Sequence, residues 1–111
     1  MFIARVKGHI VATAKDAAIK GQKLLIVEPL RVRYEHPETA SDGSGRSEAG
    51  FEVTGRAIVA MDSIGAGERQ LVLIVQGSSA RMAKGFNKVP VDAVVVGIVD
   101  EAMVHGKRIN E

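Results

Sequence analysis

The chain has 111 residues, of which 46% are hydrophobic and 25% are charged. This length suits one domain with one core, and this composition is typical of a chain that folds rather than one that stays disordered. A net charge of only +2 gives little support to nucleic-acid binding, and zero Cys excludes disulfides, thiolate nucleophiles and cysteine-bound metals.

The start of the chain and its apolar runs bear on export and membrane association. Met1-Phe2-Ile3-Ala4-Arg5 alternates like a strand and lacks the apolar block of a signal peptide. No apolar run approaches the roughly 20 residues that cross a bilayer. We therefore expect one soluble, cytoplasmic domain over residues 1–111, with no membrane partner.

Residues 2–34 show the period of two that is typical of strands with one buried face. A first strand is predicted over residues 2–13, with apolar or small residues at Phe2, Ala4, Val6, Gly8, Ile10 and Ala12. A second strand is predicted over residues 23–34. Because Pro29 cannot donate to a ladder, we expect an edge, a bulge or a bend there.

Residues 35–50 are dense in Gly, Ser and charge and predict a long exposed loop. Alternation resumes in a third strand over residues 51–61 that ends at Asp62, with apolar or small residues at Phe51, Val53, Gly55, Ala57, Val59 and Met61. A turn at Gly65-Ala66-Gly67, which requires positive φ angles, then leads into a fourth strand over residues 70–76.

The segment Ser78-Ser79-Ala80-Arg81-Met82-Ala83-Lys84 predicts a helix of about one or two turns, with a Ser as N-cap and good helix formers behind it. A fifth strand is predicted over residues 93–99. In the tail, Met103, Val104 and Ile109 are candidate packing residues that dock on a neighbouring chain or fray. These elements predict an all-β fold, a small closed barrel or a sandwich with one short helix.

The fourth and fifth strands are apolar on both faces. In the fifth, Ala93, Val95, Gly97 and Val99 would line one face and Val94, Val96 and Ile98 the other. A monomeric barrel of this size should have a wet outer face, so the pattern favours assembly with other copies of the chain. The alternative is a sheet that the chain covers with its own tail and loops.

The sequence gives little support for a catalytic or metal-binding site. His9, His36 and His105 are not spaced as a metal site, and the acidic residues are scattered at strand ends and in loops. Asp62, Asp92 and Asp100 are therefore expected to bond loop amides or pair with Lys and Arg. Neither Ser78 nor Ser79 lies in the Gly-x-Ser-x-Gly turn of hydrolases. We predict no catalytic residues, no metal and no cofactor.

Two other functions, phosphate binding and single-stranded nucleic-acid binding, have weaker support in the sequence. Gly65 to Gly67 could cradle a phosphate, but a strand rather than a helix follows them, which favours an ordinary turn. Five-stranded barrels of the oligonucleotide-binding type bind single-stranded nucleic acids on stacking aromatics. Phe2 and Phe51 fall on the apolar faces of their strands, which leaves only Tyr34 and Phe86 as platforms, so this function is the weaker alternative.

An ordered set of short motifs spans nearly the whole chain. It consists of Val6-Lys7-Gly8, Lys23-Leu24-Leu25-Ile26-Val27, Asp62-x-x-Gly65-Ala66-Gly67, Gly77-Ser78-Ser79-Ala80-Arg81, and Pro90-Val91-Asp92-Ala93 through Ile98-Val99-Asp100. In this order the motifs resemble the vertex proteins of bacterial microcompartments, the EutN/CcmL family. Two features depart from it: the loop over residues 35–50 is longer than the family needs, and the short helix lies between strands four and five, not after strand three as in the usual oligonucleotide-binding order.

The resemblance implies a small five-stranded barrel related to the oligonucleotide-binding (OB) fold. It also implies a homopentamer that caps the fivefold corners of a polyhedral shell, such as a carboxysome or an organelle for ethanolamine or diol degradation. The partners would be the hexameric and trimeric shell proteins of the same compartment, and the protein would be structural rather than an enzyme.

Small residues permit close approach between chains, and an Arg can bridge to a carboxylate or carbonyl of a neighbour. We therefore expect the two glycine-containing segments to lie at or near the subunit interface. The candidate interface residues are Asp62, Gly65, Ala66, Gly67, Gly77, Ser78, Ser79, Ala80 and Arg81.

Overall fold

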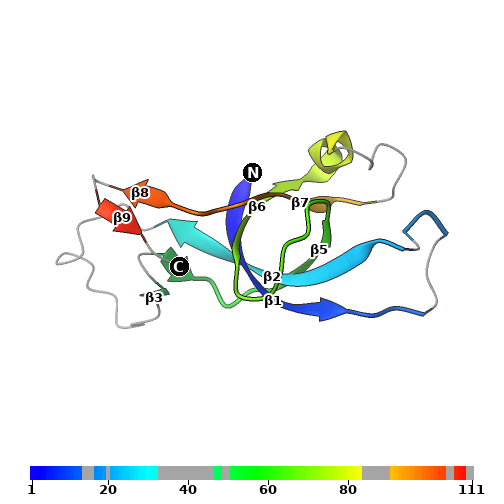
Figure 1. Cartoon of the computed structure of the whole chain (residues 1–111), viewed down its shortest axis with the longest axis horizontal. Coiled ribbons are helices and arrows are strands. Elements are labelled where there is room, and N and C mark those ends of the chain that lie inside the picture. Colours follow the sequence, from blue (N-terminus) through cyan, green and yellow to red (C-terminus); the bar gives the residue numbers. More distant parts are fainter. Residues whose placement is uncertain are drawn as a thin grey trace.

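Five strands pair in a closed circle and form a barrel (Figure 1). They are β1 (Phe2–Ile10), β2 (Lys23–Val32), β5 (Ile58–Asp62), β6 (Leu71–Gln76) and β7 (Ala93–Ile98). They follow the order β1-β6-β7-β5-β2, and the pairing of β2 with β1 closes the barrel. The β5–β7 contact is parallel, and the other four are antiparallel. The predicted five-stranded all-β barrel is confirmed.

The computed structural model describes residues 1–13, 17–19, 21–32, 47–48, 51–83, 91–104 and 107–109. The predicted loop over residues 35–50 lies outside this part of the chain, apart from residues 47–48. The elements described outside the barrel are η1 (Ala17–Ile19), β3 (Ser47–Glu48), β4 (Phe51–Val53), the 3₁₀ helix η3 (Gly77–Met82), β8 (Ala102–Val104) and β9 (Lys107–Ile109).

The interior of the barrel is filled by small and branched aliphatic side chains that alternate along its strands. The fully buried set is Ala4, Val6, Leu25, Val27, Ala60, Ala66, Val72, Ile74, Ala93 and Val95, with Phe2, Ile58 and Ile98 packed against it. No large aromatic side chain belongs to the fully buried set, which suits the narrow interior of a five-stranded barrel. The period of two in the sequence identified Phe2, Ala4 and Val6 of this core, and for β6 and β7 it separated the two faces without saying which is inward.

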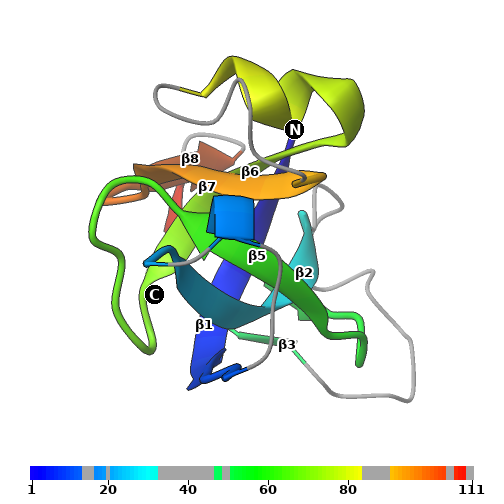
Figure 2. The same ribbon diagram turned by 90° about the vertical axis from the view of Figure 1, so that its right-hand side faces the viewer.

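The outer faces of β6 and β7 are covered largely by the chain itself. Met61, Ala80 and Val94 form a second buried cluster, in which η3 lies over β7 (Figure 2). Leu30, Phe51 and Leu71 form a third cluster beneath β4 and the start of β8, where Ala102 packs against it. Val94 is 0% exposed and Leu71 is 2% exposed. The apolar second faces of these two strands therefore do not by themselves require another chain.

Strand β2 pairs with strands of two sheets. Its residues 23–27 pair with β5, and Leu30–Val32 pair with β4, which carries β3 on its other side. Pro29 lies where the partner on this edge changes from β5 to β4, so a residue with no N–H donor is tolerated within a continuous strand. The predicted bend or bulge at Pro29 is thus replaced by a change of partner.

The predicted third strand is wrong as one continuous element. It is divided into β4 and β5 by a turn at Thr54–Ala57, where Gly55 has φ = 76°. The turn lies opposite the change of partner in β2, and it reverses the alternation. Ile58 consequently packs on the barrel core, whereas Val59, expected on the buried face, is 48% exposed.

Irregular pairing shifts the alternation in two other strands. In β7, Leu73 pairs with Gly97 and Ile74 with Val95, so Val96 is an extra residue. Ile98 therefore lies with the inward residues, not with Val94 as predicted. In β1 the register shifts between Val6 and Gly8, so the inward alternation predicted for residues 8–12 is wrong beyond Val6.

The predicted helix is present as η3, between the fourth and fifth barrel strands as expected. Its Ser N-cap is wrong, because Gln76 holds the N-cap position and makes no side-chain capping hydrogen bond. Gly77 follows with φ = 67°, which turns the chain from β6 directly into η3. In the tail, residues 102–104 and 107–109 pair as an antiparallel hairpin, a structure the sequence did not predict.

Candidate subunit interface

The two glycine-containing segments flank β7 and are both bonded to its surroundings. The Ser63 hydroxyl donates to the Val95 carbonyl at 2.6 Å, and the Gly77 N–H donates to the Asp92 carbonyl at 2.8 Å. In Figure 2, η3 lies above β7 and the light green loop between β5 and β6 runs down the left side. Both segments are thus fixed to the barrel by hydrogen bonds.

Asp62 organises the first segment from within. Its side chain is 2% exposed, its Oδ1 accepts from the Ile64 N–H at 3.1 Å, and its Oδ2 lies 3.8 Å from Lys23 Nζ. Lys23 Nζ also donates to the Ala66 carbonyl at 2.7 Å. The expectation that Asp62 bonds a loop amide and a Lys is confirmed, and these contacts hold the loop in one conformation.

The residues of this loop divide into buried and exposed positions. Ala66 is 0% exposed and plugs the barrel core, whereas Ile64 is 45% exposed and Gly65 lies on the surface. Gly65 has φ = 89°, as the predicted turn requires. Gly67 does not share this conformation, and a Cβ atom there would meet only Gln70 Oε1, at 3.8 Å.

The far end of the loop is bonded to β1. Arg69, at φ = 74°, donates its N–H to the Val6 carbonyl at 2.8 Å, and the Val6 N–H donates to the Gln70 carbonyl at 3.0 Å. Gln70 Oε1 accepts from the Gly67 N–H at 2.7 Å. A loop fixed at both ends and in its middle loses little conformational entropy when it docks.

The second segment also has a buried and an exposed side. Ala80 is 0% exposed in the cluster with Met61 and Val94, whereas Gly77, Ser78 and Ser79 are exposed. The expected bridge from Arg81 lies outside the part of the chain whose side chains are described. The surface that these segments offer a neighbour therefore consists of residues 63–65, the partly exposed Gly67, and residues 77–79, and their assignment to an interface remains a prediction.

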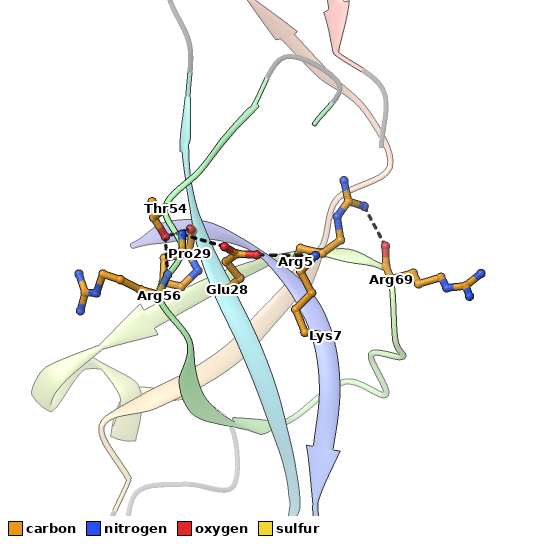
Figure 3. A network of polar contacts seen from close by, with 8 residues as sticks. Arg5, Lys7, Glu28, Pro29, Thr54, Arg56 and Arg69 are labelled. Carbon is orange, nitrogen blue, oxygen red and sulfur yellow. Dashed lines mark hydrogen bonds and ion pairs between the residues drawn. The ribbon is translucent and has the colours of Figure 1, made fainter. Parts of the chain in front are cut away.

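Two nearly buried charged residues were missed by the sequence analysis. Arg5 is 7% exposed and Glu28 is 8% exposed, and they face one another directly across β1 and β2 (Figure 3). Arg5 Nη1 donates to the Arg69 carbonyl at 2.8 Å, which ties the barrel wall to the end of the loop. Alternation placed Arg5 on a polar face, which does not predict that the residue is only 7% exposed.

Glu28 also contacts the turn that divides β4 from β5. Its Oε2 accepts from the Gly55 N–H at 2.9 Å, and its Oε1 lies 3.6 Å from Lys7 Nζ. The Thr54 hydroxyl donates to the Pro29 carbonyl at 2.6 Å and accepts from the Arg56 N–H at 3.4 Å (Figure 3). These contacts hold the turn against β2, and their role is to stabilise the fold.

The residues considered for chemistry are not assembled into a site. Among the described residues, no group of three or more His, Cys, Asp or Glu is placed to hold a metal ion. His9 lies on the surface with Nδ1 3.4 Å from Glu68 Oε1, while His36 and His105 fall outside the described residues, as do Tyr34 and Phe86. The described part of the chain has no helix long and apolar enough to cross a membrane.

Comparison with known proteins gives one consistent family. A family model described as "Ethanolamine utilisation protein EutN/carboxysome" matches residues 1–100. The bacterial microcompartment shell vertex protein EutN of Salmonella typhimurium is 40% identical over 107 residues, which are 96% of this chain and 91% of that protein.

Solved structures agree with the sequence matches. The carboxysome protein CcmL of Gloeobacter violaceus has a TM-score of 0.77 and 33% identity, and the match covers 100% of this chain and 97% of that one. The pentameric microcompartment shell protein GrpN of Rhodospirillum rubrum has a TM-score of 0.66 and 31% identity, covering 94% of this chain and 98% of that one. The barrel and its connections are thus similar to those of proteins described as shell components.

Proposed function

The chain belongs to the EutN/CcmL family, and on this basis we propose that five copies of it form a ring that caps a vertex of a bacterial microcompartment shell. The observation that carries this function is the 40% identity to a shell vertex protein across 96% of the chain. The role is structural and not catalytic, since the family consists of shell proteins. The comparisons support this function over single-stranded nucleic-acid binding.

The mechanism is geometric. Flat sixfold tiles cannot close a shell, and a fivefold ring at each corner supplies the missing curvature. The barrel suits this task because its strands pair in a closed circle and its loops are fixed by hydrogen bonds. A rigid subunit of this kind keeps the angle between neighbouring chains constant.

Within the ring, we place the exposed parts of the two glycine-containing segments at the contact between chains. Residues 63–65 and 77–79 support this placement because they are small or apolar, exposed and rigidly held. Asp62, Ala66 and Ala80 contribute by positioning these surfaces from below. The further partners would be the hexameric and trimeric tiles of the same cytoplasmic shell.

Light scattering of the purified protein tests the pentamer. The expected mass is five times the 11.8 kDa of one chain, and a single-chain mass at all concentrations would contradict the function. Binding of single-stranded DNA that weakens with added salt would instead favour the alternative.

Replacing Gly67 with Trp tests the interface. Because a Cβ atom at Gly67 would meet nothing closer than Gln70 Oε1, at 3.8 Å, the variant should fold but dissociate at higher concentrations than the unmodified ring. Val32→Trp, at a 43% exposed position at the end of β2 beside β4, is the matched control. A Gly67→Trp ring as stable as the control would remove this loop from the interface.

A further inference from the structure

Six apolar residues form a continuous outer surface across three strands of the barrel. In β1 and β2, Gly8 lies opposite Ile26, and Ile10 lies opposite Leu24. In β2 and β5, Ile26 lies opposite Val59, and Leu24 lies opposite Met61. Directly paired residues lie on the same side of a sheet. These residues form two rows of three, which we call the outer apolar face: Gly8, Ile10, Leu24, Ile26, Val59 and Met61.

This face points away from the barrel core. The intervening residues Leu25, Ala60 and Ile58 belong to the interior, so their neighbours must point outward. The face arises because the register shift after Val6 and the turn at Gly55 each reverse the alternation of the sequence. Residues that a simple period of two assigns to the core are thereby turned to the outside.

The chain covers this face only in part. Met61 is 4% exposed beneath η3, and Leu24 packs beside it. Val59, at the far end, is 48% exposed, and Ile10 and Ile26 are partly exposed. The outer face of an antiparallel barrel normally carries polar side chains, and contiguous apolar patches mark contact sites.

We propose that the outer apolar face is one half of the contact between adjacent copies of this chain; the inference rests on the proposed ring. A second copy is the occupant that the ring already requires. Contacts in a cyclic ring are heterologous, so the face packs against a different surface of the next copy and not against itself. β2, the middle strand, is paired on both edges here, so the neighbour packs by side chains and does not add a strand.

Val59→Lys tests the proposal, with Val32→Lys as the matched control. Val32 is also a strand valine, 43% exposed, but it lies at the end of β2 beside β4 and outside the face. By light scattering over a dilution series, Val59→Lys should raise the concentration at which half the chains are assembled by at least tenfold. Val32→Lys should leave it within about threefold of the unmodified protein, which is within the usual range for surface substitutions.

A second measurement does not depend on the charged variant folding. The chain contains no Cys, so Val59→Cys and Val32→Cys each introduce a single thiol. In the ring, the thiol at position 59 should react with a maleimide at least tenfold more slowly than the thiol at position 32. After dilution to single chains the two rates should become similar.

The outcomes separate this inference from the function on which it rests. If the unmodified protein forms the pentamer but position 59 labels as fast as position 32, the outer apolar face is not in the contact and the proposal is wrong. A Val59→Lys ring that assembles like the control overturns it equally. If the unmodified protein has the mass of a single chain, the pentamer itself fails, and with it this contact.

Discussion

Replacing Glu28 with Gln measures how strongly the buried charges stabilise the barrel. Glu28 and Arg5 are each less than a tenth exposed and face one another across β1 and β2. Glu28 also accepts from the Gly55 N–H at 2.9 Å and lies 3.6 Å from Lys7 Nζ. The Gln side chain keeps the shape and an acceptor for Gly55 but removes the negative charge.

The cost follows from these contacts. A hydrogen bond to a charged group contributes about 1.5–3 kcal/mol and one between neutral groups about 1 kcal/mol, so weakening the Gly55 bond costs about 1 kcal/mol. Losing the ion pair with Lys7, whose side chain is 44% exposed, adds at most about 1 kcal/mol. The total of at most about 2 kcal/mol corresponds to a fall of at most about 9 °C in Tm for a chain of this length.

Glu52→Gln is the matched control. Glu52 faces Arg31 directly across β4 and β2, with Oε1 3.0 Å from Arg31 Nη1, but the side chains are 25% and 69% exposed. Such exposed pairs contribute about 0.2–1 kcal/mol, so Tm should fall by less than about 4 °C. Thermal unfolding followed by circular dichroism at one protein concentration compares the variants. Equal shifts for the two substitutions would refute the assignment of Glu28 to a buried, stabilising network.

Four further substitutions test the loop after β5 and the packing of the barrel. Gly65→Ala should lower the free energy of unfolding by about 1–2 kcal/mol because of the positive φ, whereas Gly67→Ala should leave the isolated chain nearly unchanged; denaturant unfolding at low concentration compares them. Gly97→Val should cost about 1–3 kcal/mol in the same assay, since even its Cβ would lie 3.3 Å from Leu73 Cδ1. Phe51→Ala, at a 1% exposed position, should cost about 3–5 kcal/mol, and a smaller loss would mean that β4 is only loosely docked.

The period of two was sufficient to identify the barrel strands and the inward residues at the start of β1, Ala4 and Val6. In β6 it placed Val72 and Ile74 on one face, but both faces are apolar and the sequence did not say which is inward. It failed wherever one residue is inserted or a turn intervenes, because a single step moves every later side chain to the other face. Gly55 and Val96 mark two such places, and neither differs in type from glycines and valines that lie in regular strands.

The assignment of the two glycine-containing segments to a subunit interface stays a prediction, and only their local structure can be compared with the sequence. The positive φ expected of the turn is present at Gly65 but not at Gly67. The burial of Asp62, Ala66 and Ala80 could not be read from the sequence, because it depends on the loop and η3 folding back onto the barrel. Arg5 and Glu28 were missed for a similar reason: the groups that they bond, the Arg69 carbonyl and the Gly55 N–H, come from distant parts of the chain.

The parallel contact between β5 and β7 has a consequence for how the protein folds. Only Met61 with Val94 and Asp62 with Val95 are paired there, across more than thirty residues of chain. The hairpin of β1 and β2 forms from nearer segments, so loop-closure entropy favours its formation before the barrel closes. Because it has only two pairs, we expect this seam to be among the last parts of the barrel to form, together with the β1–β6 contact, which joins segments still farther apart in the chain. Its amides should also be among the first of the barrel to exchange with deuterium, since a short seam opens without unfolding the rest.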